Sequence, residues 1–265
     1  MCIIFIGGFG ASKYYSQHMC LKLQQYTSRK VHNISLTHGL TLAEEVNAVL
    51  EVVHDKDLTY ILMGFSTGCL VAMTLSKILK TEKIILVNPA EVLTRLNLNL
   101  LDSIVPDQDN DRNIQTFKPI LKRTGLSVLS WKVVWFLLEW IWFIAMIFIG
   151  SKKLSELYYH YQARHVNEPR ADEFEKLLFK PGRQFKELIT TLVECILKPS
   201  LIDLIRKTNR RINIVQGNKD FLYIPYVNLI YSSFLHVTLH RTNGDHHMIY
   251  HHPIETAARI STIIK

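Results

Sequence analysis

Hydrophobic and polar residues alternate along this chain with two different periods. Short apolar runs bounded by polar or glycine-rich stretches are typical of buried strands, and apolar residues three or four positions apart are typical of helices. In the first ninety residues the pattern predicts strands at 2–6, 31–36, 58–63 and 83–88, with helices at about 13–27, 41–53 and 66–80. After residue 210 it predicts strands at 212–216 and 235–240, a short helix between them, and a closing helix at 254–264.

This alternation of strands and helices predicts an α/β fold, with a parallel sheet of about six strands and helices on both faces. The alternation is interrupted between residues 91 and 209. We therefore expect residues 1–90 and 210–265 to form the α/β core, and residues 91–209 to form a mostly helical cap inserted into it. A chain of 265 residues is long enough to bury a large core in this arrangement.

The predicted cap contains an apolar, tryptophan-rich helix at about 131–149. Its residues from Val133 to Ile149 are apolar except for Glu139, and lysines border it on both sides. The run is at the short end of what a membrane-spanning helix needs, and a central glutamate makes spanning costlier. Basic residues beside such a helix favour docking on a membrane surface. A single transmembrane segment and a helix buried within the cap are the alternatives.

Composition narrows the class of protein. Hydrophobic residues make up 48% of the chain and charged residues 20%, as in a globular protein. The net charge of +8 is spread along the sequence, which argues against a nucleic-acid partner and leaves a weak attraction to anionic lipid. The four cysteines show neither metal-type spacing nor a disulfide framework, and the run at 2–6 is a predicted strand, not a secretory signal. We expect an intracellular, membrane-associated protein.

The most informative motif is Gly64-Phe65-Ser66-Thr67-Gly68, which follows an apolar strand and precedes a helix-forming stretch. Glycines two positions before and after a serine suit a strand-to-helix turn so tight that the chain on either side leaves no room for a Cβ. Such a turn raises the serine hydroxyl above the edge of the sheet and aims the first amides of the next helix at the same point. The motif therefore predicts a nucleophilic serine at position 66.

Two further motifs follow in the order carboxylate, then histidine. The predicted strand at 212–216 runs into Gly217 and Asp220, and the last predicted strand is followed by Gly244 and His246. Side chains at the carboxyl ends of parallel strands meet at one edge of the sheet. An imidazole there, oriented by a carboxylate, could take the proton of the serine hydroxyl.

In these motifs the chain resembles the α/β-hydrolase superfamily, over the part outside the predicted cap. The resemblance implies a catalytic triad of Ser66, Asp220 and His246. It also favours His246 over the adjacent His247, because members of the superfamily commonly carry a proline seven positions after the catalytic histidine, and Pro253 stands there in this chain.

The resemblance further implies an oxyanion hole made of backbone amides. One donor should be the Thr67 amide, directly after the nucleophile, and the other the Phe9 amide in the loop after the first strand. The superfamily commonly has a His-Gly pair in this loop, whereas this chain has Gly7 in the place of the histidine. Glu91, after the strand at 83–88, is an alternative to Asp220 as the acid.

Two cofactor interpretations have weaker support. The glycine-rich loop after the first strand lacks the full dinucleotide-binding pattern. The C-terminal histidines include His247 and His251 at helical spacing, but no acidic or cysteine ligand completes a metal site. We therefore expect neither a cofactor nor a metal.

The sequence thus predicts a lipase- or esterase-like serine hydrolase that cleaves carboxylic esters through an acyl-enzyme. The apolar cap helix favours a lipid ester, such as a monoacylglycerol or a lysophospholipid, taken from a membrane surface. Two alternatives stay open. One is a catalytically inactive, membrane-associated binding protein with the same fold, and the other is an acyltransferase that uses the same three residues.

Overall fold

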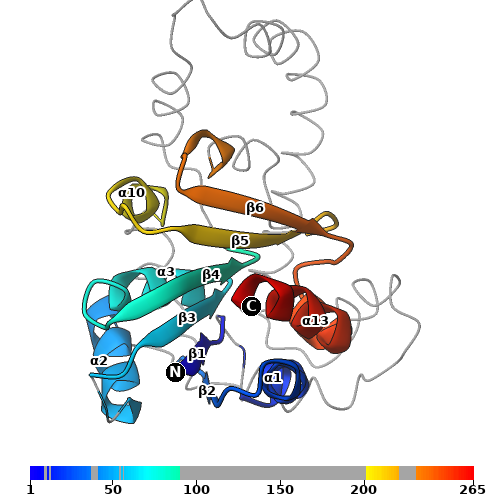
Figure 1. The fold of residues 1–265 in the computed structure, drawn as a ribbon, viewed down its shortest axis with the longest axis horizontal. Helices are drawn as coiled ribbons and strands as arrows, with labels where there is room; N and C mark the ends of the chain where they lie inside the picture. Colours follow the sequence, from blue (N-terminus) through cyan, green and yellow to red (C-terminus); the bar gives the residue numbers. More distant parts are fainter. Residues whose placement is uncertain are drawn as a thin grey trace, which may run out of the picture. The chain divides into compact units, whose positions relative to one another are not determined.

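The computed structural model contains a six-stranded sheet in the order β2-β1-β3-β4-β5-β6, with every pair of neighbouring strands parallel (Figure 1). The residues that the structure describes are 1–8, 11, 13–36, 41–53, 55, 57–89, 201–220 and 231–265. The strands are β1 (Cys2–Ile6), β2 (Val31–Ile34), β3 (Tyr60–Phe65), β4 (Thr81–Val87), β5 (Ile212–Gly217) and β6 (Val237–Thr242). This all-parallel sheet confirms the predicted fold class.

Helices cover both faces of the sheet (Figure 1). On one face α1 (Lys13–Thr27) packs against α13 (Pro253–Ile264), and the short α12 (Met248–His251) contacts both. On the other face α3 (Gly68–Leu75) contacts α2 (Leu42–Val52) and α10 (Leu201–Arg206). The chain passes from β1 to β2 in one direction along the sheet and then from β2 to β3 in the other. Because crossovers between parallel strands are right-handed as a rule, this reversal of direction puts helices on both faces.

Burial follows the position of each strand in the sheet. All six residues of the central strand β3 are buried, whereas no residue of the edge strand β6 is fully buried. A strand with helices on both sides needs apolar side chains on both of its faces. On α13 the buried residues include Ala257, Ile260 and Ile264, at the three- and four-residue spacing of one helix face. The hydrophobic pattern of the sequence is therefore the burial pattern of the fold.

Several element ends differ from the prediction by a few residues. β3 continues two residues further than expected and ends directly before Ser66. β6 begins at Val237 instead of residue 235, because the preceding residues form a turn in which the Val237 N–H donates to the Phe234 carbonyl and Leu235 is fully exposed. α3 ends at Leu75 instead of about residue 80, since turns follow it.

The predicted cap at 91–209 lies outside the described residues except for 201–209. Within that short piece α10 packs against α3. The tryptophan-rich helix predicted at 131–149 belongs to the part that is not described. No helix among the described residues is long and apolar enough to cross a membrane.

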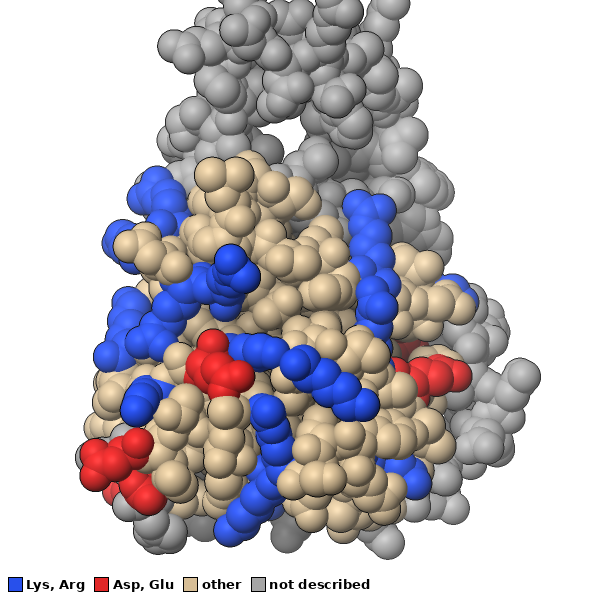
Figure 2. Space-filling view, viewed as in Figure 1, with Lys and Arg blue, Asp and Glu red and all other residues tan. Residues whose placement is uncertain are grey.

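Basic side chains are spread over the face shown in Figure 2, with acidic side chains between them. Exposed basic residues of the described part include Lys80, Arg206 and Arg210. Arg206 pairs with Asp203 on α10 at 3.4 Å. The positive charge is therefore distributed over several elements, as it is along the sequence.

Candidate active site

Ser66 lies at the tip of a tight turn between β3 and α3. Its backbone φ is 53°, in the left-handed region that residues other than glycine rarely adopt. The flanking glycines allow the turn, because a Cβ on Gly64 would lie 2.5 Å from the Cα of Cys69, and one on Gly68 would lie 2.4 Å from the carbonyl oxygen of Gly7. The two glycines are thus required by close backbone approach, as the motif predicts. The strained serine at the tip is typical of a functional position.

Hydrogen bonds join Ser66, His246 and Asp220 into one chain. Nε2 of His246 lies 3.1 Å from the Ser66 Oγ, and Nδ1 lies 3.0 Å from each carboxylate oxygen of Asp220. The three residues are only 6%, 4% and 7% exposed, so little water competes for these bonds. The carboxylate favours the imidazole tautomer that carries its proton on Nδ1, and Nε2 can then accept the proton of the serine hydroxyl.

The topology of the sheet brings these residues together. Ser66 follows β3, Asp220 follows β5 and His246 follows β6, so all three lie at the carboxyl edge of the sheet. The chain leaves β1 for β2 on one side and reaches β3 on the other, and a crevice forms where the strand order switches in this way. The loop after β1 passes close to the nucleophile, since a Cβ on Gly8 would lie 2.8 Å from the Ser66 Cβ.

Gln216 is a site residue that the sequence analysis missed. Its Nε2 donates a hydrogen bond of 2.9 Å to Oδ2 of Asp220, and the residue is 2% exposed. The bond holds the carboxylate against the imidazole of His246. A long polar side chain near the end of an otherwise apolar strand was the available signal, because a buried amide needs a partner.

Of the two adjacent histidines, the structure places His246 within hydrogen-bonding distance of Ser66. The Tyr15 hydroxyl forms a hydrogen bond with Nδ1 of His247. The pKa of His247 is lowered to about 3, mainly by burial and in smaller part by the neighbouring His246 and His251, while Asp245 opposes the change. His247 is therefore neutral at physiological pH. His251 donates a hydrogen bond of 2.7 Å from Nδ1 to the Asp245 carboxylate.

The backbone amide of Thr67 lies at the start of α3. Among the described residues it donates to no hydrogen-bond acceptor, which is usual for the first N–H groups of a helix. Such an amide can donate to a negatively charged oxygen above Ser66. Phe9, the second expected donor, and Glu91, the alternative acid, lie outside the described residues.

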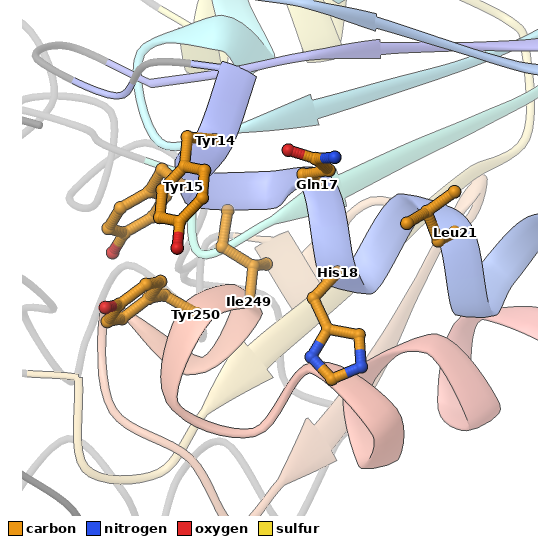
Figure 3. Close-up of a pocket in the computed structure, with 7 residues that line it drawn as sticks. All are labelled: Tyr14, Tyr15, Gln17, His18, Leu21, Ile249 and Tyr250. Carbon is orange, nitrogen blue, oxygen red and sulfur yellow. The ribbon is translucent and has the colours of Figure 1, made fainter. Parts of the chain in front are cut away.

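A hollow of about 230 Å³ lies between α1 and α12 (Figure 3). Tyr15 and Tyr250 stand side by side in it, with stacked rings whose centroids are 5.1 Å apart. Neither Ser66 nor His246 lines this hollow. Tyr15 also stacks on Phe65, whose ring packs against His246, so a series of aromatic rings connects the hollow to the site without opening it to the serine.

The arrangement around Ser66 can support nucleophilic attack on a carbonyl carbon. It combines a serine, an imidazole that can accept its proton, and a carboxylate that orients the imidazole. In the described part of the chain, no group of three or more histidine, cysteine, aspartate or glutamate residues is arranged to hold a metal ion.

Comparison with known proteins supports the fold. No family model matches the sequence, and no curated protein sequence matches it either. A carboxylesterase structure from the thaumarchaeon Nitrososphaera gargenis has a TM-score of 0.60 at 12% identity, covering 99% of this chain and 89% of that one. A thermophilic esterase from Thermogutta terrifontis has a TM-score of 0.62 at 11% identity, with 100% and 89% covered.

An extracellular α/β-hydrolase from a Paenibacillus species is similar over nearly its whole length. Its TM-score is 0.58 at 14% identity, covering 99% of this chain and 98% of that one. Identities this low carry information about the fold alone. Together with the all-parallel sheet and the turn at Ser66, these similarities show that the protein has the α/β-hydrolase fold that its motifs predict.

Proposed function

We propose that the protein is a serine hydrolase that cleaves carboxylic esters. Ser66 would be the nucleophile, His246 the general base and Asp220 the carboxylate that orients it. The observation that carries this proposal is the continuous chain of hydrogen bonds from Ser66 through His246 to Asp220. The similar solved structures include esterases, which fits this class of reaction.

In the first half of the reaction the Ser66 Oγ attacks the ester carbonyl carbon while Nε2 of His246 takes the hydroxyl proton. Negative charge develops on the former carbonyl oxygen, and we assign its stabilisation to the backbone amides of Thr67 and Phe9. His246 then gives its proton to the departing alcohol, which leaves the acyl group on Ser66.

In the second half His246 takes a proton from water, and the resulting hydroxide attacks the acyl-enzyme. The acid is released when His246 returns this proton to the Ser66 Oγ. The imidazole is positively charged midway through both halves, and the buried Asp220 carboxylate stabilises that charge.

We further propose that the substrate is a lipid ester, such as a monoacylglycerol or a lysophospholipid. The apolar, tryptophan-rich segment at 131–149 supports this, since such helices bind at membrane interfaces. Replacing Trp135 and Trp142 by serine should weaken binding to phospholipid vesicles and leave hydrolysis of a short soluble ester unchanged. Equal loss of both would instead indicate a helix buried within the cap.

Labelling with a fluorophosphonate probe tests the class of reaction. We expect the parent protein to be labelled, Ser66→Ala to be unlabelled, and Ser76→Ala to be labelled like the parent. Ser76 is a suitable control because it is also buried, but its hydroxyl donates to the Met73 carbonyl at 2.7 Å instead of to an imidazole. Competition with a panel of long-chain esters then identifies the substrate class.

Two other results of this experiment would point elsewhere. Folded parent protein that resists the probe would overturn the hydrolase proposal and favour a binding protein with the same fold. If the probe reacts and an added alcohol acceptor collects the acyl group more efficiently than water, the protein is an acyltransferase that uses the same three residues.

A further inference from the structure

Asn88 is a buried polar residue to which the reaction above assigns no role. It directly follows β4, which lies between β3 and β5 in the sheet, and it is fully buried. Its backbone φ is 43°, in the left-handed region that asparagine tolerates better than most residues other than glycine. Because burying a polar side chain costs free energy unless it is hydrogen-bonded, its partners indicate what it does.

The side chain of Asn88 makes three hydrogen bonds. Its Oδ1 accepts one from the Gly217 N–H at 2.7 Å, and its Nδ2 donates to the carbonyl oxygens of Asp245 at 2.7 Å and His246 at 3.0 Å. The partners determine the orientation of the amide, because the reverse orientation would set donor against donor and acceptor against acceptors. One side chain thus connects the end of β5 to the loop that carries His246.

Backbone contacts hold the same elements together. The Asn88 N–H donates to the Val215 carbonyl at 2.9 Å, which fixes the residue to β5. The loop after β5 and the loop after β6 touch, since a Cβ on Gly217 would lie 2.4 Å from the Gly244 carbonyl oxygen. Of the side chains described at this junction, that of Asn88 bonds directly to the backbone of His246.

The geometry points to Asn88 as a positioning residue for His246. By holding the carbonyls of Asp245 and His246 at a fixed distance from β5, it determines how far the imidazole reaches toward Ser66. That reach has little tolerance, because the Nε2–Oγ distance is already 3.1 Å and such bonds weaken steeply beyond this range. The kinetic consequence rests on the proposed function, in which a misplacement on the order of 1 Å costs about 100-fold in rate.

Two substitutions separate the hydrogen bonds of Asn88 from its backbone conformation. Asn88→Asp keeps the shape of the side chain and the oxygen that accepts from Gly217. It replaces the NH2 group, which donates to the carbonyls of Asp245 and His246, by an oxygen that cannot donate. Asn88→Gly removes all three bonds without straining the positive φ. Asn213→Asp is a matched control on β5, because that side chain bonds His240 at 3.0 Å, away from the three residues of the site.

We expect both Asn88 variants to lower kcat for a short soluble ester by about 100-fold with KM within about twofold of the parent, since the imidazole and not the substrate is displaced. Asn213→Asp should keep the parent kcat. Folded Asn88 variants that keep the parent kcat would overturn the assignment. Loss of folding in both Asn88 variants, while Asn213→Asp folds, would also overturn it in favour of a purely structural role.

A second measurement does not depend on hydrolysis. The proton on Nδ1 of His246, held by the Asp220 carboxylate, should give a low-field NMR signal that is absent in His246→Gln. We expect this signal to shift or disappear in both Asn88 variants and to persist in Asn213→Asp, and an unchanged signal would count against positioning. The parent protein could also fold and show the signal, yet neither cleave esters nor react with the probe. That result would refute the proposed function, and the effect of the Asn88 substitutions on the signal would then decide whether Asn88 positions His246.

Discussion

Replacing Asp220 by asparagine should move a proton from one side of His246 to the other. In the parent, Gln216 donates to Oδ2 of Asp220 at 2.9 Å, and both carboxylate oxygens lie 3.0 Å from Nδ1 of His246. Gln216 would hold the new carbonyl oxygen at the Oδ2 position, so the new NH2 group would face Nδ1. This group only donates, and the carbonyl oxygen at the Oδ2 position is already bonded to Gln216, so we expect Nδ1 to accept from the NH2 group and the ring proton to move to Nε2. Nε2 could then no longer take the proton of Ser66.

The expected loss follows from that change of tautomer. Losing a correctly protonated base in this type of site lowers kcat by about 10,000-fold, which corresponds to about 5 kcal/mol of transition-state stabilisation. KM for a short ester should change little, since Asp220 is 7% exposed and lies behind the imidazole. Initial rates with p-nitrophenyl acetate would measure both constants, with Asn213→Asp as the folded control.

A second substitution in the same pair tests the reasoning itself. Adding Gln216→Glu to Asp220→Asn places an acceptor where the parent has a donor, so the new amide should turn its NH2 toward position 216 and its oxygen toward Nδ1 of His246. The swap keeps one carboxylate and one amide at this buried point. It also replaces Oε1 of Gln216, a buried atom without a hydrogen-bond partner among the described residues, by a carboxylate oxygen. We expect the double variant to be faster than Asp220→Asn by about 10- to 100-fold. A double variant that is no faster would refute the tautomer explanation.

Two further predictions concern stability. The folded protein holds the pKa of His247 at about 3 against an ordinary value of 6.5, so the unfolded chain binds a proton that the folded one does not, and stability is lost as pH falls from about 6.5 toward 3. In denaturant melts, the parent should lose unfolding free energy between pH 7 and pH 4.5, and His247→Gln should lose about 1–3 kcal/mol less. His18→Gln, at an exposed position, is the control. An equal effect of the two substitutions would contradict the assignment to His247. Gly68→Ala should lower the unfolding free energy by about 1–3 kcal/mol, because its Cβ would lie 2.4 Å from backbone oxygens. Gly7→Ala should cost less, since its nearest contact is 3.5 Å, and equal melts for the two variants would show that the turn at the serine can widen.

The strands, most of the helices and the turn at Ser66 follow from the sequence because each depends on neighbours in the chain. A strand needs a short apolar run, α13 needs apolar residues at helical spacing, and the tight turn needs Gly64 and Gly68 on either side of the serine. The order of Ser66, Asp220 and His246 along the chain also matched the resemblance to the α/β-hydrolases. The element ends were less well predicted, because a turn such as the one before β6 interrupts an apolar pattern without changing its composition.

Only the tertiary structure decided which polar residues surround His246. Asn88 and Gln216 stand at strand ends, where a polar residue is equally compatible with a loop, and the sequence analysis assigned them no role. Their importance lies in partners that the sheet brings close, since Asn88 bonds the backbone of a residue 158 positions away. The same holds for the low pKa of His247, which depends on burial against α1 and on the neighbouring imidazoles. Hydrophobic periodicity specifies elements locally, whereas hydrogen-bond geometry and electrostatic environment exist only after those elements have packed.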